Sequence, residues 1–457
     1  MGRSGRWGDD PLAEPLSEET TASQIERTDK RTRPRGWGAG LSPNIRVQTV
    51  AALLGGTYRG AFVPVWQPFV LSLGASVRLL GLLESLGGWS GIVSSLMQLL
   101  GGWLADRVGR KPIVVLSSLF NALAMFLFTL AAGLRWWPLL VPAVILSGMG
   151  LIAQAARSSV TAESVNQEGR GRAYSLTMFA FIAPGVVSSV LGGWVAQHWG
   201  YLPIMAVGAG LEAIVLFTLA RFLRETLPPE TPQARPATRL PLAPLLRVVM
   251  DRSLGLLKTV KGLWKLLIPL AADAFFWGLA GSLMFGILRD HLKFTPQQLG
   301  WVNAFNSLAW ALTQLPVGRL VERYGCKRFL VIAEALAACC IASWLLWPTF
   351  LGISLSYALL GSTAALWVPA LMTLLAGTFG EKERGRAMGL VFTVQGLSRF
   401  PAPYLAGVLY QWKGYSAPLL AGLVGVSIVT VLLAVLLQDP PAVAANRPDA
   451  DSPAPRT

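Results

Sequence analysis

The sequence contains few of the residues that carry covalent or metal chemistry. Among 457 residues there are only three cysteines and two histidines. Cys326, Cys339 and Cys340 have neither the number nor the spacing of a disulfide framework or a metal site. No catalytic constellation can be built from so few thiol and imidazole groups, and no nucleotide-binding loop occurs. The sequence therefore predicts no enzyme activity, no metal and no cofactor.

Charge is also scarce. Charged residues make up 14% of the chain, whereas about 25% is usual for a soluble domain. Hydrophobic residues reach 53%, and the mean hydropathy is +0.51. A soluble protein could not cover its surface with so few charges. Apolar stretches of about 20 residues, the length that crosses a bilayer, recur along the chain, so we predict an all-α polytopic membrane protein with twelve transmembrane helices.

The expected helices follow a polar N-terminal tail, residues 1–45, which has the composition of a disordered segment and no signal-peptide pattern. A proline-rich and then basic linker, residues 224–263, separates two sets of six; it could include an amphipathic helix on the membrane surface. A second polar tail covers residues 438–457. The predicted helices are 47–71, 78–103, 112–133, 137–160, 172–197, 201–223, 264–288, 297–320, 328–347, 351–376, 386–411 and 415–437.

The distribution of lysine and arginine predicts the orientation. By this helix map, 31 of the 39 basic residues lie on the side that carries both termini, and five lie on the other. Cytoplasmic loops retain basic residues, so both termini are expected in the cytoplasm. The same bias explains the net charge of +15 and makes nucleic-acid binding an unnecessary hypothesis.

One short loop stands out between two of the apolar stretches. Residues 101–112 read GGWLADRVGRKP, and their four charges cannot lie in hydrocarbon. The flanking stretches, 79–104 and 113–132, are each long enough to cross a membrane. Gly102 and Gly109 suit a tight hairpin, because a residue without Cβ permits a sharp backbone path and close helix approach.

This loop resembles the signature G-x-L-x-D-R-x-G-R-K of the major facilitator superfamily. All seven fixed positions are filled, by Gly102, Leu104, Asp106, Arg107, Gly109, Arg110 and Lys111. The resemblance implies a secondary transporter of twelve helices in two pseudo-symmetric six-helix bundles.

A second copy of the loop supports this reading. Adding 216 to Gly102, Arg107 and Gly109 gives Gly318, Arg323 and Gly325, with Glu322 in place of Asp106. Transporters are often built from related halves. We therefore assign residues 46–223 and 264–437 to the two bundles.

In that family the loop stabilises the outward-open state. Asp106 can approach the helix that begins near Arg386, and Glu322 the helix near Arg172, because a helix N-terminus favours an anion by about 0.3–1 kcal/mol. Glu163 is expected to pair with Arg107 or Arg110. The predicted gating residues are Gly102, Asp106, Arg107, Gly109, Arg110, Glu163, Gly318, Glu322, Arg323 and Gly325.

Ionisable residues inside the predicted helices are candidates for substrate binding and coupling, because burying each costs about 2.5–3.5 kcal/mol or more. By resemblance, five lie on helices that line the cavity: Arg59, Glu84, Arg157, Asp273 and Arg399. Static ion pairs are the alternative for these five, and a structural role is favoured for Glu212 and Glu334. Arg59 and Asp273 are 214 residues apart, at related positions of the repeat. The five carry a formal charge of +1, which would favour anionic or zwitterionic ligands.

The favoured function is proton-coupled efflux, by antiport, of a small organic molecule across a bacterial-type plasma (inner) membrane. We expect a monomer in the lipid bilayer whose partners are the substrate and protons. Two motifs of drug/proton antiporters are absent: residues 144–150 lack R-x-x-Q-G, and residues 188–193 lack G-P-x-x-G-G. Uptake of an organic anion or sugar by symport or facilitated diffusion therefore remains open. A membrane sensor without transport activity, or a membrane-embedded enzyme, is a weaker alternative.

Overall fold

The computed structural model describes residues 42–88, 91–166, 170–227, 263–379 and 381–439. Residues 1–42 and 43–457 separate into two units, and the described helices belong to the second. The predicted tails and the possible amphipathic helix of the linker lie almost wholly outside the described residues. Between residues 42 and 439 the described residues form helices joined by short turns, with no strand among them.

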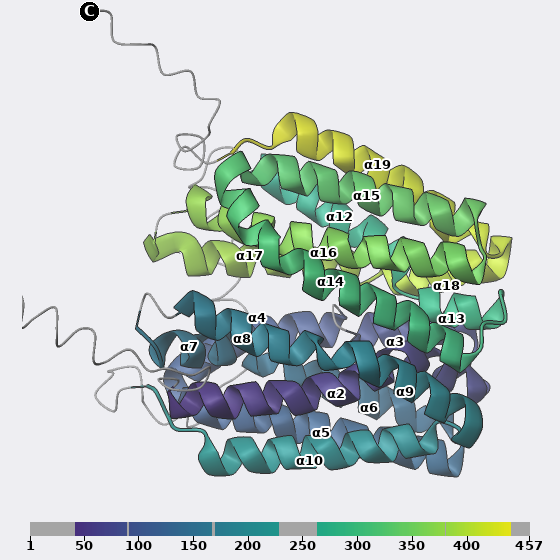
Figure 1. Ribbon diagram of the computed structural model, residues 1–457, viewed down its shortest axis with the longest axis horizontal. Helices are drawn as coiled ribbons and strands as arrows, with labels where there is room; N and C mark the ends of the chain where they lie inside the picture. Colours follow the sequence, from purple (N-terminus) through teal and green to yellow (C-terminus); the bar gives the residue numbers. More distant parts are fainter. Residues whose placement is uncertain (1–41, 89–90, 167–169, 228–262, 380, 440–457) are drawn as a thin grey trace, which may run out of the picture. The chain divides into compact units, whose positions relative to one another are not determined.

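The helices fall into two groups along the chain (Figure 1). The N-terminal half contains α2 (Pro43–Ser72), α3 (Val77–Gly87), α4 (Ile92–Val108), α5 (Arg110–Leu134), η1 (Trp137–Leu139), α6 (Leu140–Met149), η2 (Gly150–Ala153), α7 (Gln154–Glu163), α8 (Arg170–Ile182), α9 (Pro184–Trp199) and α10 (Leu202–Phe222). The C-terminal half contains α12 (Trp264–Gly281), α13 (Met284–Asp290), α14 (Pro296–Tyr324), α15 (Cys326–Leu346), α16 (Phe350–Thr378), α17 (Glu381–Arg399), α18 (Ala402–Lys413) and α19 (Ser416–Leu436).

Long apolar helices confirm the predicted class, an all-α multi-pass membrane protein. Within the described residues, nine helical stretches are long and apolar enough to cross a bilayer. Three further stretches, α2, α14 and α17 with α18, match predicted helices but are more polar, so the count of twelve stays a prediction. Large apolar side chains are exposed on the outside; Leu346 is 85% and Val435 71% accessible. Such an apolar surface suits contact with lipid.

Five of the predicted helices are interrupted, which corrects their description as single stretches. The breaks separate α3 from α4, α6 from α7, α8 from α9, α12 from α13, and α17 from α18. Pro184 and Pro401 stand at two of them, because proline lacks the N–H that an inner helical turn needs. The helices predicted at 112–133, 201–223, 328–347 and 415–437 are continuous, as α5, α10, α15 and α19.

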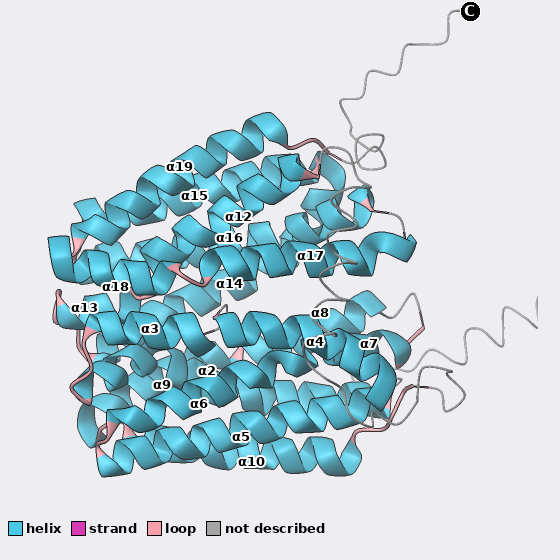
Figure 2. Cartoon of the chain, turned by 180° about the vertical axis from the view of Figure 1, so that it is seen from behind, coloured by secondary structure: helices cyan, strands magenta, loops and turns pink. Residues whose placement is uncertain are grey.

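The two halves pack closely at one end of the molecule. We call this the distal end, because it lies opposite the loop between α4 and α5, and we call the other the loop end. Helix α3 lies beside α18 (Figure 2). A Cβ atom at Gly81 of α3 would lie 2.4 Å from the carbonyl oxygen of Pro403 in α18. On the other flank, a Cβ at Gly193 of α9 would lie 2.5 Å from the oxygen of Pro296 in α14. Glycine is required at both places because backbones from the two halves touch there.

A side chain at Gly81 is therefore expected to oppose closure of the distal end. In Gly81→Ala, overpacking costs about 1–3 kcal/mol, which corresponds to about 5- to 150-fold in the ratio of closed to open molecules. Distances between spin labels placed across the distal end should lengthen. Gly210→Ala is the matched control, because no atom lies within 4 Å of a Cβ there. Equal distance distributions in the two variants would show that this contact does not limit closure.

Candidate functional site

Four of the five predicted cavity residues lie in one row of alternating charge. The row crosses between the halves, from Arg59 on α2 through Glu84 on α3 to Arg399 on α17 and Asp273 on α12. Glu84 interacts electrostatically with both Arg399 and Arg59, and Arg399 interacts in the same way with Asp273 and Glu84. Each charge thus has an opposite neighbour, which is how buried charges are tolerated in an apolar interior.

The Glu84 carboxylate is fixed by two side chains of α2. Trp66 Nε1 donates to Glu84 Oε1 over 2.9 Å, and Gln67 Nε2 donates to the same oxygen over 3.2 Å. Both donors precede the distal end of α2, so the carboxylate is held where α2, α3 and the C-terminal half approach one another.

Gln67 also joins the two halves. Its Nε2 donates to the carbonyl oxygen of Ser282 over 2.6 Å, and its Oε1 accepts from the backbone N–H of Gly286 over 2.7 Å. These backbone groups flank the break between α12 and α13, where a membrane interior supplies no water to replace a lost helical hydrogen bond. A single amide therefore completes the backbone of the broken helix and fastens the distal end.

The fifth predicted residue, Arg157, lies in a different cluster. Its Nη2 donates to Ser118 Oγ over 3.3 Å, and the charge that acts on it is that of Glu212. Glu212 is 4% exposed and accepts a hydrogen bond from the Tyr58 hydroxyl. Arg157 is compensated inside the N-terminal half, so it is not part of the row.

The structure changes two details of the sequence interpretation. The cation that acts on Asp273 is Arg399 and not Arg59, the residue at the related position of the repeat. Glu212 contacts Tyr58 and lies near Arg157 in the interior, so its carboxyl group offsets the formal surplus of +1 among the five residues. The sequence analysis also missed Trp66 and Gln67. A glutamine within an apolar stretch indicates a buried polar contact, so Gln67 could have been found from the sequence.

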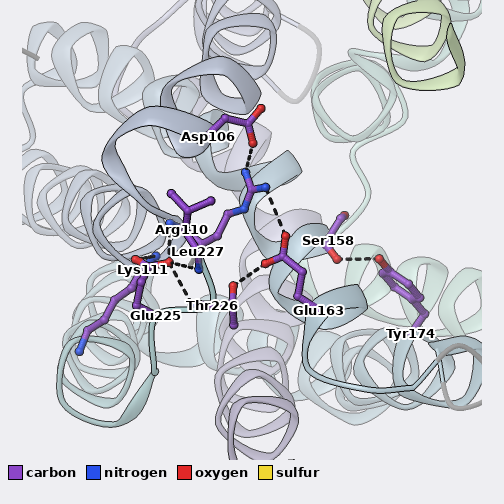
Figure 3. Close-up of polar contacts among 9 residues, drawn as sticks. All are labelled: Asp106, Arg110, Lys111, Ser158, Glu163, Tyr174, Glu225, Thr226 and Leu227. Carbon is purple, nitrogen blue, oxygen red and sulfur yellow. Dashed lines mark hydrogen bonds and ion pairs between the residues drawn. The ribbon is translucent and has the colours of Figure 1, made fainter. Parts of the chain in front are cut away.

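A second polar cluster surrounds the signature loop (Figure 3). The Arg110 guanidinium bonds Asp106, and its Nη2 lies 3.3 Å from Glu163 Oε1, so Arg110 is the arginine that pairs with Glu163. Thr226 Oγ1 donates to the other Glu163 oxygen over 2.5 Å. Arg107 instead lies over the Trp103 ring, 3.9 Å from its centroid.

Glu225, which the sequence interpretation did not single out, holds this cluster to the chain beyond α10. Its carboxylate accepts from the backbone N–H groups of Arg110, Lys111, Thr226 and Leu227 at 2.9–3.1 Å (Figure 3). Burial alone would raise the pKa of Glu225, but these four donors outweigh it, and the pKa lies below its usual range. The carboxylate therefore caps the N-terminus of α5.

The same device occurs in the C-terminal half. Glu225 plus 214 is Asp439, whose Oδ1 accepts from the Lys327 N–H over 2.8 Å at the start of α15. Gly109 and Gly325 precede the two capped helices with φ of 113° and 93°, a region that favours glycine. The offset of 214 residues, which also relates Arg59 to Asp273, would have indicated this pair from the sequence.

The other predicted gating contacts are only partly described. A Cβ at Gly102 would meet Ala155 of α7 at 3.4 Å, an ordinary packing distance. The side chains of Glu322, Arg323 and Arg386, and the surroundings of Gly318, lie outside the described residues. Among the described residues, no three His, Cys, Asp or Glu side chains are grouped as a metal site.

Comparison with known proteins gives a consistent result. The family model of the Major Facilitator Superfamily matches residues 49–288 and, a second time, residues 266–456. Multidrug resistance protein MdtH of Proteus mirabilis is 28% identical over 324 residues, which are 66% of this chain and 74% of that protein. Multidrug resistance protein MdtG of Klebsiella pneumoniae is 23% identical over 417 residues, 90% of this chain and 97% of that protein.

A solved structure extends the likeness to the fold. The crystal structure of the human organic anion transporter MFSD10 (TETRAN) matches 86% of this chain and 99% of its own, with a TM-score of 0.62. The sequence identity is 17%, so this similarity concerns the fold alone.

The Glu225 cap predicts a pH-dependent stability. Because its pKa is lowered in the folded protein, its contribution is complete above the ordinary glutamate pKa of about 4.3 and is lost as the pH falls through the lowered value. At about pH 7, Glu225→Gln should lower the free energy of unfolding by about 1 kcal/mol or less, since the group is partly exposed. Thermal unfolding followed by tryptophan fluorescence would measure this. The difference from the wild type should shrink on acidification, and a difference that stays constant would contradict the cap.

Proposed function

Because the chain belongs to the Major Facilitator Superfamily, we propose that it is a secondary active transporter that exports a small organic molecule in exchange for protons. The observation that carries this proposal is the row of alternating charges, which crosses from one half to the other in the apolar interior. Burying four charges in the membrane interior costs free energy, and well-packed apolar residues could replace static ion pairs there with little loss of stability. A role in transport therefore explains the row better than a structural role.

The different contacts at the two ends of the molecule support transport by alternating access. At the distal end, Gln67 and the glycine contacts hold the halves together, so this structure corresponds to the inward-facing state if the loop end is cytoplasmic. At the loop end, Arg110, Asp106 and Glu163 form a cluster within the N-terminal half. In the outward-facing state this cluster would meet the C-terminal half, and Asp106 would exchange its bond with Arg110 for contact with the start of α17.

Efflux is favoured over uptake by the named relatives, which are multidrug resistance proteins at 23–28% identity. The interior charges also support it, because the carboxyl group of Glu212 removes the surplus of positive charge that would select anions. Small amphipathic molecules are therefore the proposed substrates, and the protein acts as a monomer in the inner membrane.

Proton coupling is assigned to Asp273, which lies in the row beside Arg399. Asp273→Asn should abolish substrate accumulation driven by a pH gradient, while substrate binding and downhill exchange persist. Everted and right-side-out vesicles, tested with a panel of compounds with and without the gradient, would measure this. Accumulation in right-side-out vesicles alone would indicate uptake instead of efflux. Wild-type accumulation in the variant would remove Asp273 from the coupling step, and equal loss of binding and exchange would make it a substrate or structural residue.

The proposed orientation places the loop end and both termini in the cytoplasm. A cysteine at Val108, which is exposed beside Gly109, should react with an impermeant maleimide only after the cells are opened. Lys413→Cys, at the distal end, is the control and should react in intact cells. The exposed Cys339 is first replaced by alanine. Labelling of Val108→Cys in intact cells would reverse the orientation.

A further inference from the structure

Glu334 is a buried acid at the end of the charge row. It lies on the inward face of α15, between Leu330 and Ala337, and it is 3% exposed. One of its oxygens, Oε1, has no hydrogen-bond partner. An ionised carboxylate in such a place would be very costly, so the position of Glu334 requires a chemical reason.

The reason lies in its neighbour. The carboxyl groups of Glu334 and Asp273 are within hydrogen-bonding reach of each other. Two carboxylates cannot form that bond, because neither has a proton to donate and their charges repel. A hydrogen bond between the two groups therefore requires a proton on one of them.

The charges around the pair are unequal. Among the described side chains, Arg399 of α17 is the cation whose charge acts on Asp273. The only described charge that acts on Glu334 is the negative charge of Asp273. The adjoining α19 has no ionisable residue, and α16 has only Tyr357. Cys339 and Cys340 lie on α15 itself, five and six residues after Glu334. The other ionisable residues on α12 and the packed helices stand near the helix ends: Lys265, Arg319, Glu322, Arg323, Tyr324, Cys326, Lys327, Arg328, Glu381, Lys382, Glu383, Arg384, Arg386, Tyr404, Tyr410 and Lys413.

We propose that Asp273 and Glu334 form a proton-binding site between α12 and α15, in which one proton is shared and Arg399 balances the remaining negative charge. Arg399 favours the ionised form of Asp273, so the proton belongs mainly to Glu334, whose hydroxyl donates to Asp273. The proton therefore lies on Glu334, on the opposite side of Asp273 from Arg399 and the rest of the charge row.

Arg399 connects this site to the contact between the halves. It is shared by Asp273 in its own half and Glu84 in the other. Loss of the proton adds a second negative charge beside Asp273, which draws Arg399 away from Glu84 and weakens the distal closure. Gain of the proton has the opposite effect, so by reciprocity the distal-closed state binds the proton more tightly. The use of this site for coupling rests on the proposed function, whereas the shared proton itself does not.

Infrared spectroscopy of the full chain in lipid nanodiscs tests the site directly. At neutral pH, Glu334→Gln should lose one protonated-carboxyl C=O band relative to the wild type, because the glutamine amide then donates to an ionised Asp273. Asp273→Asn should retain the band at a shifted frequency, because Glu334 stays buried and protonated. Glu212→Gln, the matched buried glutamate of the N-terminal half, should leave the band of the pair unchanged.

A second measurement covers the case in which Glu334→Gln does not fold. Distances between spin labels across the distal end should lengthen in the wild type as the pH rises, and Asp273→Asn should abolish that response. An unchanged carboxyl band in folded Glu334→Gln, or no pH response in the wild type, would overturn the proposal. If the band behaves as expected but vesicles show no proton-driven transport, the proton site stands and the proposed function fails.

Discussion

A membrane interior offers no water to a backbone group that loses its helical partner, and this constraint governs the distal closure. The break between α12 and α13 exposes the Ser282 oxygen and the Gly286 N–H. Gln67 satisfies both from the other half, while Glu84 accepts its remaining N–H. Because the same amide completes the helix and joins the halves, opening of the distal end must provide other partners for these groups.

The charge row meets a related requirement, because a charge in the apolar interior needs an opposite charge nearby. Arg59, Glu84, Arg399 and Asp273 alternate in sign, so no member is buried alone. The row is anchored in both halves, with Glu84 and Arg399 at the crossing point. In the proposed transport cycle, a relative movement of the halves would change which carboxylate lies beside Arg399, and this would link the charge state of the interior to the conformation.

At the loop end, both halves end one helix and begin the next in the same manner. Gly109 and Gly325 turn the chain with positive φ, and Glu225 and Asp439 cap the helices that follow. Each capping residue comes from the segment after the last helix of its own half. The first residues of the central linker are consequently part of the loop cluster, because Thr226 bonds Glu163 while Glu225 holds α5.

The sequence by itself determined the membrane class, the signature loop and the repeat, because hydropathy and fixed spacing are properties of the chain alone. It also identified most of the interior charges, since ionisable residues are rare in apolar stretches. Only the tertiary structure decided that Arg399, and not the symmetry-related Arg59, acts on Asp273, and that the peripheral Glu334 reaches the same site. Helical periodicity gives the face on which a residue lies. The partner depends on how broken helices from distant parts of the chain pack, and no local pattern encodes that packing.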